Sequence, residues 1–228
     1  MAVASELSYV ALKTRRQPGI GGKWNSPDRT HAEELSLTYF CEDSEFRPQT
    51  DLKLLYDAQH LYGVFRVRDQ YVYCAETEYQ ADVTRDASVA AYFQASPDGG
   101  YLAFEMNCCG TLRARYFEEP SVEKGALPGR IAQLPWKDGH QVRIYTSQFG
   151  AIESEIPEPM TWYLEFVIPF ALFEKYTIVN RPLRDNPWRA NFYKCASRCS
   201  HPHRASWSPL RDGVSFNQPE SFAPLYFA

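Results

Sequence analysis

The chain has 228 residues, a formal net charge of −4, and 44% hydrophobic and 23% charged residues, proportions close to the globular average. These values exclude a disordered or collagen-like chain, and the acidic balance argues against nucleic acid as the main partner. Aromatic residues reach 15%, which suits an all-β fold and a ligand face built from rings. The longest apolar run, 166–173, is broken by Pro169, so we expect no membrane span.

Short runs that alternate between apolar and polar residues, with turn residues between them, predict strands. The segment 118–139 contains Pro and Gly and is predicted to be a long loop. Helical signal is weak, and only 169–176, with Pro169 at its start, is predicted to form a short helix. In chain order, the expected strands are 52–56, 61–68, 88–94, 101–107, 112–117, 142–146, 163–168, 189–195 and 225–227.

About ten short strands with little helix predict an all-β fold, an antiparallel β-sandwich with jelly-roll-like character. The sequence contains no internal repeat or long linker, so one domain is expected over residues 1–228. Alternation within 101–107 directs one set of side chains to the core and the other set to the opposite face. The core set is Leu102, Phe104 and Met106, and the opposite set is Tyr101, Ala103, Glu105 and Asn107. The core is also expected to hold Trp24, Trp162, Trp188 and Trp207.

Five short motifs follow one another along the chain in a fixed order. They are RDASV at 85–89, YLAFEMNCCGT at 101–111, NFYKC at 191–195, SWSP at 206–209 and SFNQPESF at 215–222. Together with the predicted hairpin at 50–69, this set resembles the carbohydrate-binding module family 9-like proteins, relatives of the DOMON sandwiches, over about residues 24–228. The resemblance implies a β-sandwich that binds sugars, in some members at the reducing end of a glycan.

In the sugar-binding members of that family, two Trp rings sandwich the sugar. By the motif match, the later ring falls on Phe216, whereas the earlier one would lie near Thr84, where no Trp stands. An Arg on the central strand that contacts sugar in those members corresponds to Glu105. The two-ring clamp is therefore not reproduced, although the implied fold is unaffected.

A sugar site needs an exposed ring for the apolar face of the pyranose and fixed donors and acceptors for its hydroxyl groups. We expect Phe216 to be the platform and Asn217 and Gln218 to be hydroxyl partners. A polar floor would come from Glu105 and Asn107, with Asp86 near by. The remaining predicted contacts are Lys194, as an anion or hydroxyl donor, and Tyr71, as a replacement for the missing ring.

Alternatives stay open at these positions. Glu105 needs a partner such as Arg113, Arg115 or Lys194 if its face is covered, or else belongs to a charge ladder on a solvated face. The segment 194–204 contains Cys-x3-Cys-x-His-x-His, which is a candidate zinc site, an anion-binding edge or a solvated basic loop. The six cysteines are expected to be mostly buried free thiols.

No cofactor is predicted apart from calcium, which the family resemblance makes a candidate. Its ligands would come from an acidic stretch of the chain, namely Asp69, Glu76, Glu78, Asp82 and Asp86.

The sequence favours non-catalytic binding of a mono- or oligosaccharide, a glycan end or an acidic sugar. One alternative is a glycoside hydrolase or lyase that uses carboxylates such as Glu105 and Asp86, or Glu105 with His201. A second is a protein-interaction sandwich with a degenerate sugar site. No catalytic residue is assigned, and the sequence specifies neither the sugar nor the oligomeric state. With no secretory signal in view, a cytoplasmic location is expected for a full-length chain, and a periplasmic or secreted one if a signal was trimmed.

Overall fold

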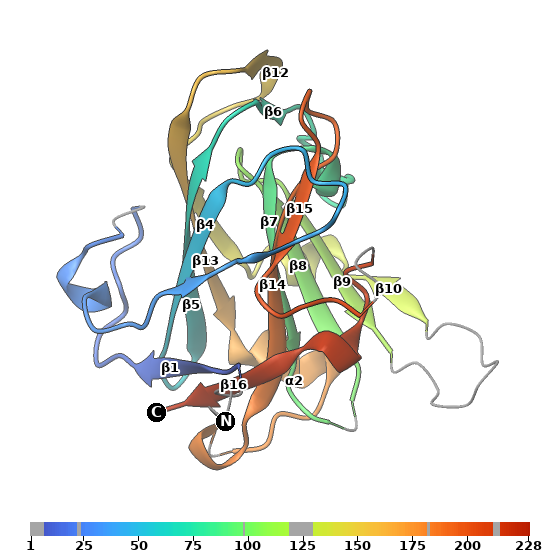
Figure 1. Ribbon diagram of the computed structural model, residues 1–228. Helices are drawn as coiled ribbons and strands as arrows, with labels where there is room; N and C mark the ends of the chain where they lie inside the picture. The colour runs from blue at the N-terminus through green and yellow to red at the C-terminus, as the bar shows by residue number, and fades with distance from the viewer. Residues whose placement is uncertain (1–6, 22–23, 98, 119–129, 182, 212–214) are drawn as a thin grey trace, which may run out of the picture.

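Two β-sheets lie face to face in the computed structural model, with the apolar core between them (Figure 1). The structure describes residues 7–21, 24–97, 99–118, 130–181, 183–211 and 215–228. We name the sheets after a central strand of each, the β14 sheet and the β5 sheet.

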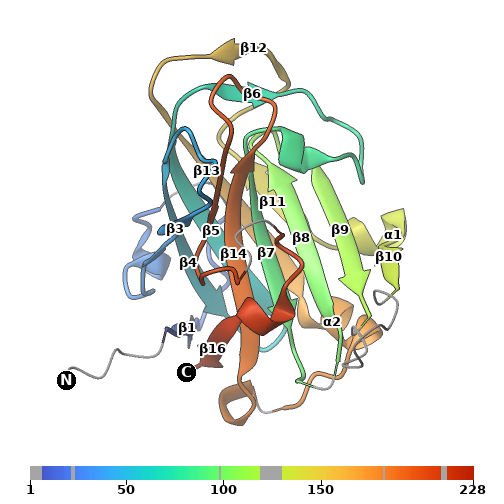
Figure 2. The ribbon, with the colours of Figure 1, turned by 45° about the vertical axis from the view of Figure 1, so that its right-hand side comes forward.

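The β14 sheet has the strand order β10-β9-β8-β7-β14-β16-β1, and Figure 2 shows β9, β8, β7 and β14 side by side. Two further strands extend it, because β15 pairs with β14 and β3 pairs with β15. Its strands are β1 (Tyr9–Lys13), β3 (Tyr39–Phe40), β7 (Ser88–Gln94), β8 (Tyr101–Asn107), β9 (Leu112–Phe117), β10 (Ile131–Gln133), β14 (Trp188–Ala196), β15 (His203–Ser206) and β16 (Ala223–Phe227).

The β5 sheet has the order β1-β4-β5-β13-β11, and β2 pairs with β4 on the same edge as β1, at Asp51 and Leu52. It is formed by β2 (Leu35–Ser36), β4 (Gln49–Tyr56), β5 (His60–Asp69), β11 (Arg143–Thr146) and β13 (Met160–Pro169). A separate two-stranded sheet joins β6 (Val72–Cys74) to β12 (Ile152–Ile156) at one end of the molecule (Figure 1).

The strand β1 belongs to both sheets. Tyr9 to Ala11 pair with β16, and Leu12 and Lys13 pair with β4, in each case parallel. The other strand pairs within the described residues are antiparallel. The expected antiparallel sandwich is confirmed, with this parallel seam as an addition that the alternation pattern did not predict.

Side chains alternate across the strands as their sequences predict. Leu102, Phe104 and Met106 face the core and belong to the same buried cluster as Phe65 and Trp162 from the β5 sheet. Gly63 is needed for this packing, because a Cβ atom at this residue would lie only 2.1 Å from Cζ of the Phe166 ring. Three of the four Trp residues expected in the core lie there, namely Trp162, Trp188 and Trp207. The prediction for Trp24 is wrong: its ring is buried beneath Lys53 and Arg66, which alternate with the core residues of β4 and β5 and so face away from the core.

Helices are short, as predicted. The helix α2 (Phe170–Tyr176) begins directly after Pro169, which caps it, and it lies against the core. The expected loop 118–139 is wrong in its second half, where β10 and the helix α1 (Trp136–Gly139) form; residues 119–129 lie outside the described part. Single 3-10 turns occur at η1 (Pro27–Arg29), η2 (Val83–Arg85), η3 (Leu183–Asp185) and η4 (Pro219–Ser221). Among the helices described, none is long and apolar enough to cross a membrane.

Candidate functional site

A pocket of about 490 Å³ opens on the outward face of the β14 sheet, the face turned away from the core. We call it the sheet-face pocket. Strands β7, β8, β9 and β14 form its floor, and the segments around η2, before β15 and before η4 form its sides. It is lined by Asp43, Asp82, Thr84, Tyr92, Glu105, Arg113, Arg115, Cys195, Ala196, Ser197, Pro202, His203, Arg204, Phe216 and Asn217.

At the floor of the pocket, one carboxylate holds two guanidinium groups. Glu105 on β8 accepts hydrogen bonds from Arg113 Nε and from Arg115 Nη2, the latter at 2.8 and 3.0 Å from its two oxygens. The Tyr92 hydroxyl donates to the same carboxylate at 2.6 Å. Cross-strand pairing brings these groups together, because Arg113 lies opposite Glu105 in the β8–β9 register.

The two arginines differ in their remaining contacts. Arg113 also forms an ion pair with Asp82, and its Nη2 lies 3.4 Å from Thr84 Oγ1. Burial alone would lower the pKa of Arg113, but the hydrogen bond to Glu105 and the nearby charges raise it. Arg115 lies over the Phe117 ring, and its Nε is buried without a hydrogen-bond partner. The floor therefore presents charged donors in fixed positions, one of them with an unused N–H.

One aromatic ring lines the pocket beside these donors. Phe216 is half-buried and stacks on Tyr193, with ring centroids 4.2 Å apart and an interplanar angle of 23°. The Tyr193 hydroxyl donates to the Phe216 carbonyl at 3.2 Å, which holds the segment against β14. Asn217 follows on the exposed edge, with its Oδ1 3.5 Å from the Tyr101 hydroxyl. The pocket thus combines a supported ring with an exposed amide.

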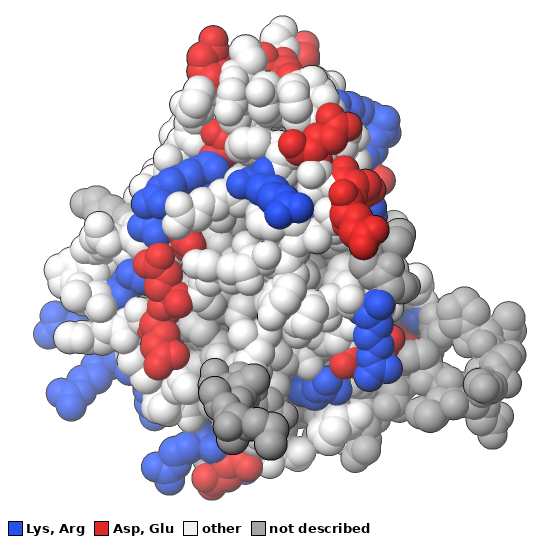
Figure 3. All heavy atoms as spheres, viewed as in Figure 1, with Lys and Arg blue, Asp and Glu red and all other residues white. Residues whose placement is uncertain are grey.

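Formal charges in the pocket balance. Its three arginines are matched by Asp43, Asp82 and Glu105. Burial and the charge of Lys194 together lower the pKa of His203 to about 3, although Asp69 acts in the opposite direction, so the ring is neutral near pH 7. Burial raises the pKa of Cys195 to about 12, so this side chain is a neutral thiol. On the face seen in Figure 1, basic and acidic side chains likewise stand in small groups with uncharged surface between them (Figure 3).

Three of the residues predicted as ligand contacts lie in this pocket: Phe216, Asn217 and Glu105. Of the three partners considered for Glu105, the structure brings Arg113 and Arg115 to it and not Lys194. Gln218 lies next to the pocket residues in sequence, but its side chain is buried. It donates to the Ser215 carbonyl and accepts from Arg211 N, so it holds its own loop together.

Lys194 lies on the other face of β14, inside the core. Its Nζ is 3.2 Å from Asp69 Oδ2 on β5 and 2.9 Å from His203 Nε2, and its side chain is fully buried. Alternation explains this position, because Lys194 follows Phe192 on the core side of the strand, whereas Tyr193 faces the pocket. Lys194 therefore joins the two sheets and does not reach the pocket.

The other three predicted contacts also lie elsewhere. Asn107 is buried at the end of β8, where its amide donates to Asp86 Oδ2 and to the Glu76 carbonyl. Asp86 is itself fully buried in this arrangement. Tyr71 stacks on His201 at a centroid distance of 3.7 Å, near the small β6–β12 sheet. The structure therefore does not bring Asp86 or His201 into the pocket with Glu105, the pairs considered for catalysis.

The acidic residues considered for calcium do not gather into a site. Asp69 pairs with Lys194, Asp82 with Arg113, Asp86 with the Asn107 amide, and Glu76 with Arg198. Since calcium needs six to eight convergent oxygen ligands, these side chains do not fit it in the arrangement described. The zinc candidate in 195–203 does not form either; among described residues, the cluster of three metal-ligating groups is Cys74, Cys108 and Cys109.

Asp43 and Pro202 are among the pocket residues that the sequence analysis did not single out. Both lie in connecting segments, Asp43 after β3 and Pro202 before β15, and no periodic pattern marks such positions. Their proximity follows from β15 pairing with β3, a contact between distant parts of the chain.

Comparison with known proteins supports the same family as the motifs. The sequence profile described as "Carbohydrate-binding family 9" matches residues 30–227. No curated protein gives a significant sequence match to the chain.

Solved structures with the same fold span nearly the whole chain. A candidate carbohydrate-binding protein from Bacteroides uniformis ATCC 8492 has a TM-score of 0.83 and 23% identity, covering 98% of this chain and 100% of that one. A family 9 carbohydrate-binding module from Caldicellulosiruptor kristjanssonii, in complex with glucose, has a TM-score of 0.62 and 11% identity over 96% and 95% of the two chains. The same kind of module in complex with cellotriose gives 0.63 and 11% over 97% and 93%. With the profile match covering most of its length, the chain belongs to carbohydrate-binding family 9 and binds carbohydrate without catalysis.

Proposed function

We propose that the sheet-face pocket is the sugar site and that it takes a neutral pyranose of the glucose type. The observation that carries this proposal is the meeting of a supported aromatic ring, Phe216, with the fixed guanidinium donors of Arg113 and Arg115 in one cavity. The ring would cover the apolar face of the sugar, and the donors would pair with its hydroxyl groups. Family 9 modules of this fold bind glucose and cellotriose in the solved complexes, which supports the same ligand class here.

The charge balance of the pocket favours a neutral sugar over an acidic one. Arg113 and Arg115 are already paired with Asp82 and Glu105, so an added carboxylate would compete for occupied donors. Lys194, the residue considered for an acidic sugar, lies in the core. We expect glucose and cellotriose to bind more tightly than glucuronate.

Titration calorimetry with glucose, cellotriose and glucuronate tests this proposal, using Phe216→Ala against a matched control. Phe149→Ala is suitable, because Phe149 is 81% exposed and lies outside the pocket. Burying a Phe side chain contributes about 1.5–3 kcal/mol, so Phe216→Ala should weaken cellotriose binding by roughly 10- to 100-fold. The control should bind as the unchanged protein does.

A second variant is needed because Phe216→Ala could change the local structure of the 215–218 segment and weaken binding for that reason alone. Arg115→Met removes donors on a different strand, β9, and should also weaken binding. Equal affinity of Phe216→Ala, Arg115→Met and Phe149→Ala would show that the sugar binds somewhere else. Preferred binding of glucuronate would contradict the assignment to neutral sugars.

A further inference from the structure

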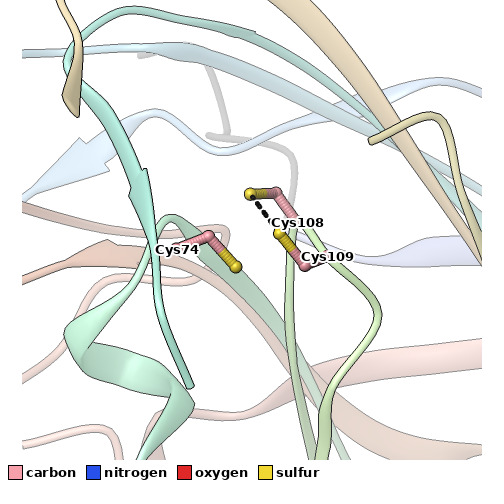
Figure 4. Close-up of side chains that lie close together, drawn as sticks. All are labelled: Cys74, Cys108 and Cys109. Atoms are coloured by element: carbon pink, nitrogen blue, oxygen red, sulfur yellow. Dashed lines mark hydrogen bonds between the residues drawn. The ribbon is translucent and has the colours of Figure 1, made fainter. Parts of the chain in front are cut away.

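Three cysteines that the sugar site does not use come together at one end of the sandwich. Cys74 ends β6, and Cys108 and Cys109 form the turn between β8 and β9. Figure 4 shows their three sulfur atoms turned toward a common space. All three lie within 4.8 Å of one another, and the Cys108 and Cys109 sulfurs are 3.9 Å apart.

Backbone hydrogen bonds fix the segments that carry these side chains. The amide of Cys108 donates to the Ala87 carbonyl, and the amide of Ala87 donates to the Tyr73 carbonyl, each at 2.8 Å. This chain of bonds connects the turn to the residue before Cys74. At Gly110, φ is +92°, a conformation that favours glycine and reverses the chain directly after the cysteine pair. The three thiols are therefore held in place before any ligand arrives.

A buried carboxylate without a complete set of partners stands beside the thiols. Asp86 Oδ2 accepts from Asn107 Nδ2 and from Glu76 N, both at 2.9 Å, and so it touches the segments on both sides of the cysteine cluster. Its Oδ1 is buried with no hydrogen-bond partner, and among the ion pairs of the described residues none involves Asp86. Asp86 therefore keeps one unused acceptor oxygen next to the segments that carry the cysteines.

The cysteine cluster is accessible to a ligand from solvent. Cys74 and Cys108 are fully buried, whereas Cys109 is partly exposed and lines a second cavity of about 390 Å³. We call this cavity the Trp136 pocket, since Trp136, Tyr79 and His140 also line it. It lies apart from the sheet-face pocket and shares no lining residue with it.

From this geometry we propose that Cys74, Cys108 and Cys109 bind one zinc ion through three sulfur ligands, with the fourth position open toward the Trp136 pocket. At a Zn–S distance of about 2.3 Å, a tetrahedral site places two sulfurs about 3.8 Å apart. The Cys108–Cys109 separation already matches this value. The other separations, at most 4.8 Å, need to shorten by about 1 Å or less. Thiolate ligands select zinc and other soft ions over calcium or magnesium.

The bound ion would connect the small β6–β12 sheet to the β8–β9 turn. Binding would release three thiol protons, so that Zn²⁺ with its three thiolate ligands carries a net charge of −1. The site does not depend on the sugar proposal, because its residues are separate from the sheet-face pocket.

Zinc titration of the reduced full chain, with a chromophoric chelator as competitor, tests the proposal. We expect one zinc per chain. Cys109→Ser removes one of the three metal ligands. It should therefore lower the zinc affinity by more than the roughly 10- to 100-fold that is lost when only a hydrogen-bond partner of a ligand is removed. Cys199→Ser is the matched control, because Cys199 is a buried free thiol in the 197–200 turn that does not belong to the cluster, so its loss should leave zinc binding unchanged. Circular dichroism of each variant verifies that it is folded.

Cobalt substitution of the unchanged protein gives a second measurement that needs no variant. A sulfur-rich tetrahedral site should give intense visible bands and thiolate-to-cobalt charge transfer. The proposal is overturned by an octahedral cobalt spectrum without charge transfer, or by equal zinc affinity in Cys109→Ser and Cys199→Ser. Thiol counting in denaturant, on protein purified without reductant, should give six free thiols, as in the structure. A count of four would show a disulfide in place of the metal site.

Discussion

The buried ion pair between Lys194 and Asp69 offers the sharpest test of the fold. Lys194→Met keeps the length and the apolar character of the side chain but removes the ammonium group. Asp69 would then remain as a buried charge that accepts from the Trp162 Nε1–H and the Gln70 amide, with the neutral His203 ring 4.0 Å away. Both side chains of the pair are at most 1% exposed, so solvent cannot replace the lost partner.

Removing one partner from a buried ion pair costs about 3–5 kcal/mol. For a domain of this size, each kcal/mol lowers Tm by about 2–4 °C, so Lys194→Met should lower Tm by roughly 6–20 °C. The double variant Asp69→Asn with Lys194→Met removes both charges and leaves an amide oxygen that can accept from Trp162. We expect it to recover a large part of the loss, which a double-mutant cycle would measure as coupling.

The assay is thermal unfolding and urea titration of the unchanged protein, the two single variants and the double variant. Calorimetry with cellotriose is carried out on the same four proteins. Because Lys194 faces the core and not the sheet-face pocket, each variant that folds should keep its sugar affinity. A Lys194→Met protein with an unchanged Tm and a lost sugar affinity would refute this reasoning. It would place Lys194 at the ligand, as the sequence predicted.

Three further predictions concern the pocket and its surroundings. Thr84→Trp should tighten cellotriose binding in calorimetry, because a second ring would cover the open face of the sugar; weaker binding would show that Thr84 does not lie beside the ligand. Glu105→Gln should lower Tm by roughly 2–12 °C and weaken sugar binding, since it unpairs Arg113 and Arg115 at a cost of about 1–3 kcal/mol. An unchanged Tm together with an unchanged sugar affinity would contradict the role of the carboxylate. His203 has a pKa of about 3 in the fold and about 6.5 when unfolded, so the unfolded chain binds the extra proton between these values. The free energy of unfolding should therefore fall as the pH drops from 6.5 toward 3, by up to about 1.4 kcal/mol per pH unit. The urea midpoint of His203→Gln should depend less steeply on pH than that of the unchanged protein. An equal pH dependence of the two midpoints would refute this prediction.

The alternation of apolar and polar residues within single segments was sufficient to predict many strands of the sandwich. The strands predicted at 88–94, 101–107 and 112–117 form with those bounds, and Glu105 faces away from Phe104 as expected. A period of two residues is a property of each strand by itself, which explains why it could be read without the rest of the chain. The positions of Phe216 and Asn217 in the pocket followed from the motif match, since alternation carries no information about a loop.

The unpredicted features depend on contacts between distant segments. Lys194 alternates with the core residues of β14, but a lysine is expected there only when its partner on β5 is known. Asn107 shares the outward parity of Glu105, yet it ends the strand, and its side chain closes the turn that follows. The parallel seam at β1 joins residues from the two ends of the sequence, and no local pattern specifies it.

The parallel seam has a consequence for the order in which the chain can fold. Hairpins such as β4–β5 and β7–β8 join neighbouring segments and can form early, whereas β1 must wait for β16 from the far end of the sequence. Until then, β1 and β14 each present an unpaired edge that is open to other chains. Loss of the few residues of β16 would therefore leave both edges exposed together, and aggregation during synthesis, more than loss of the pocket, would be its first effect.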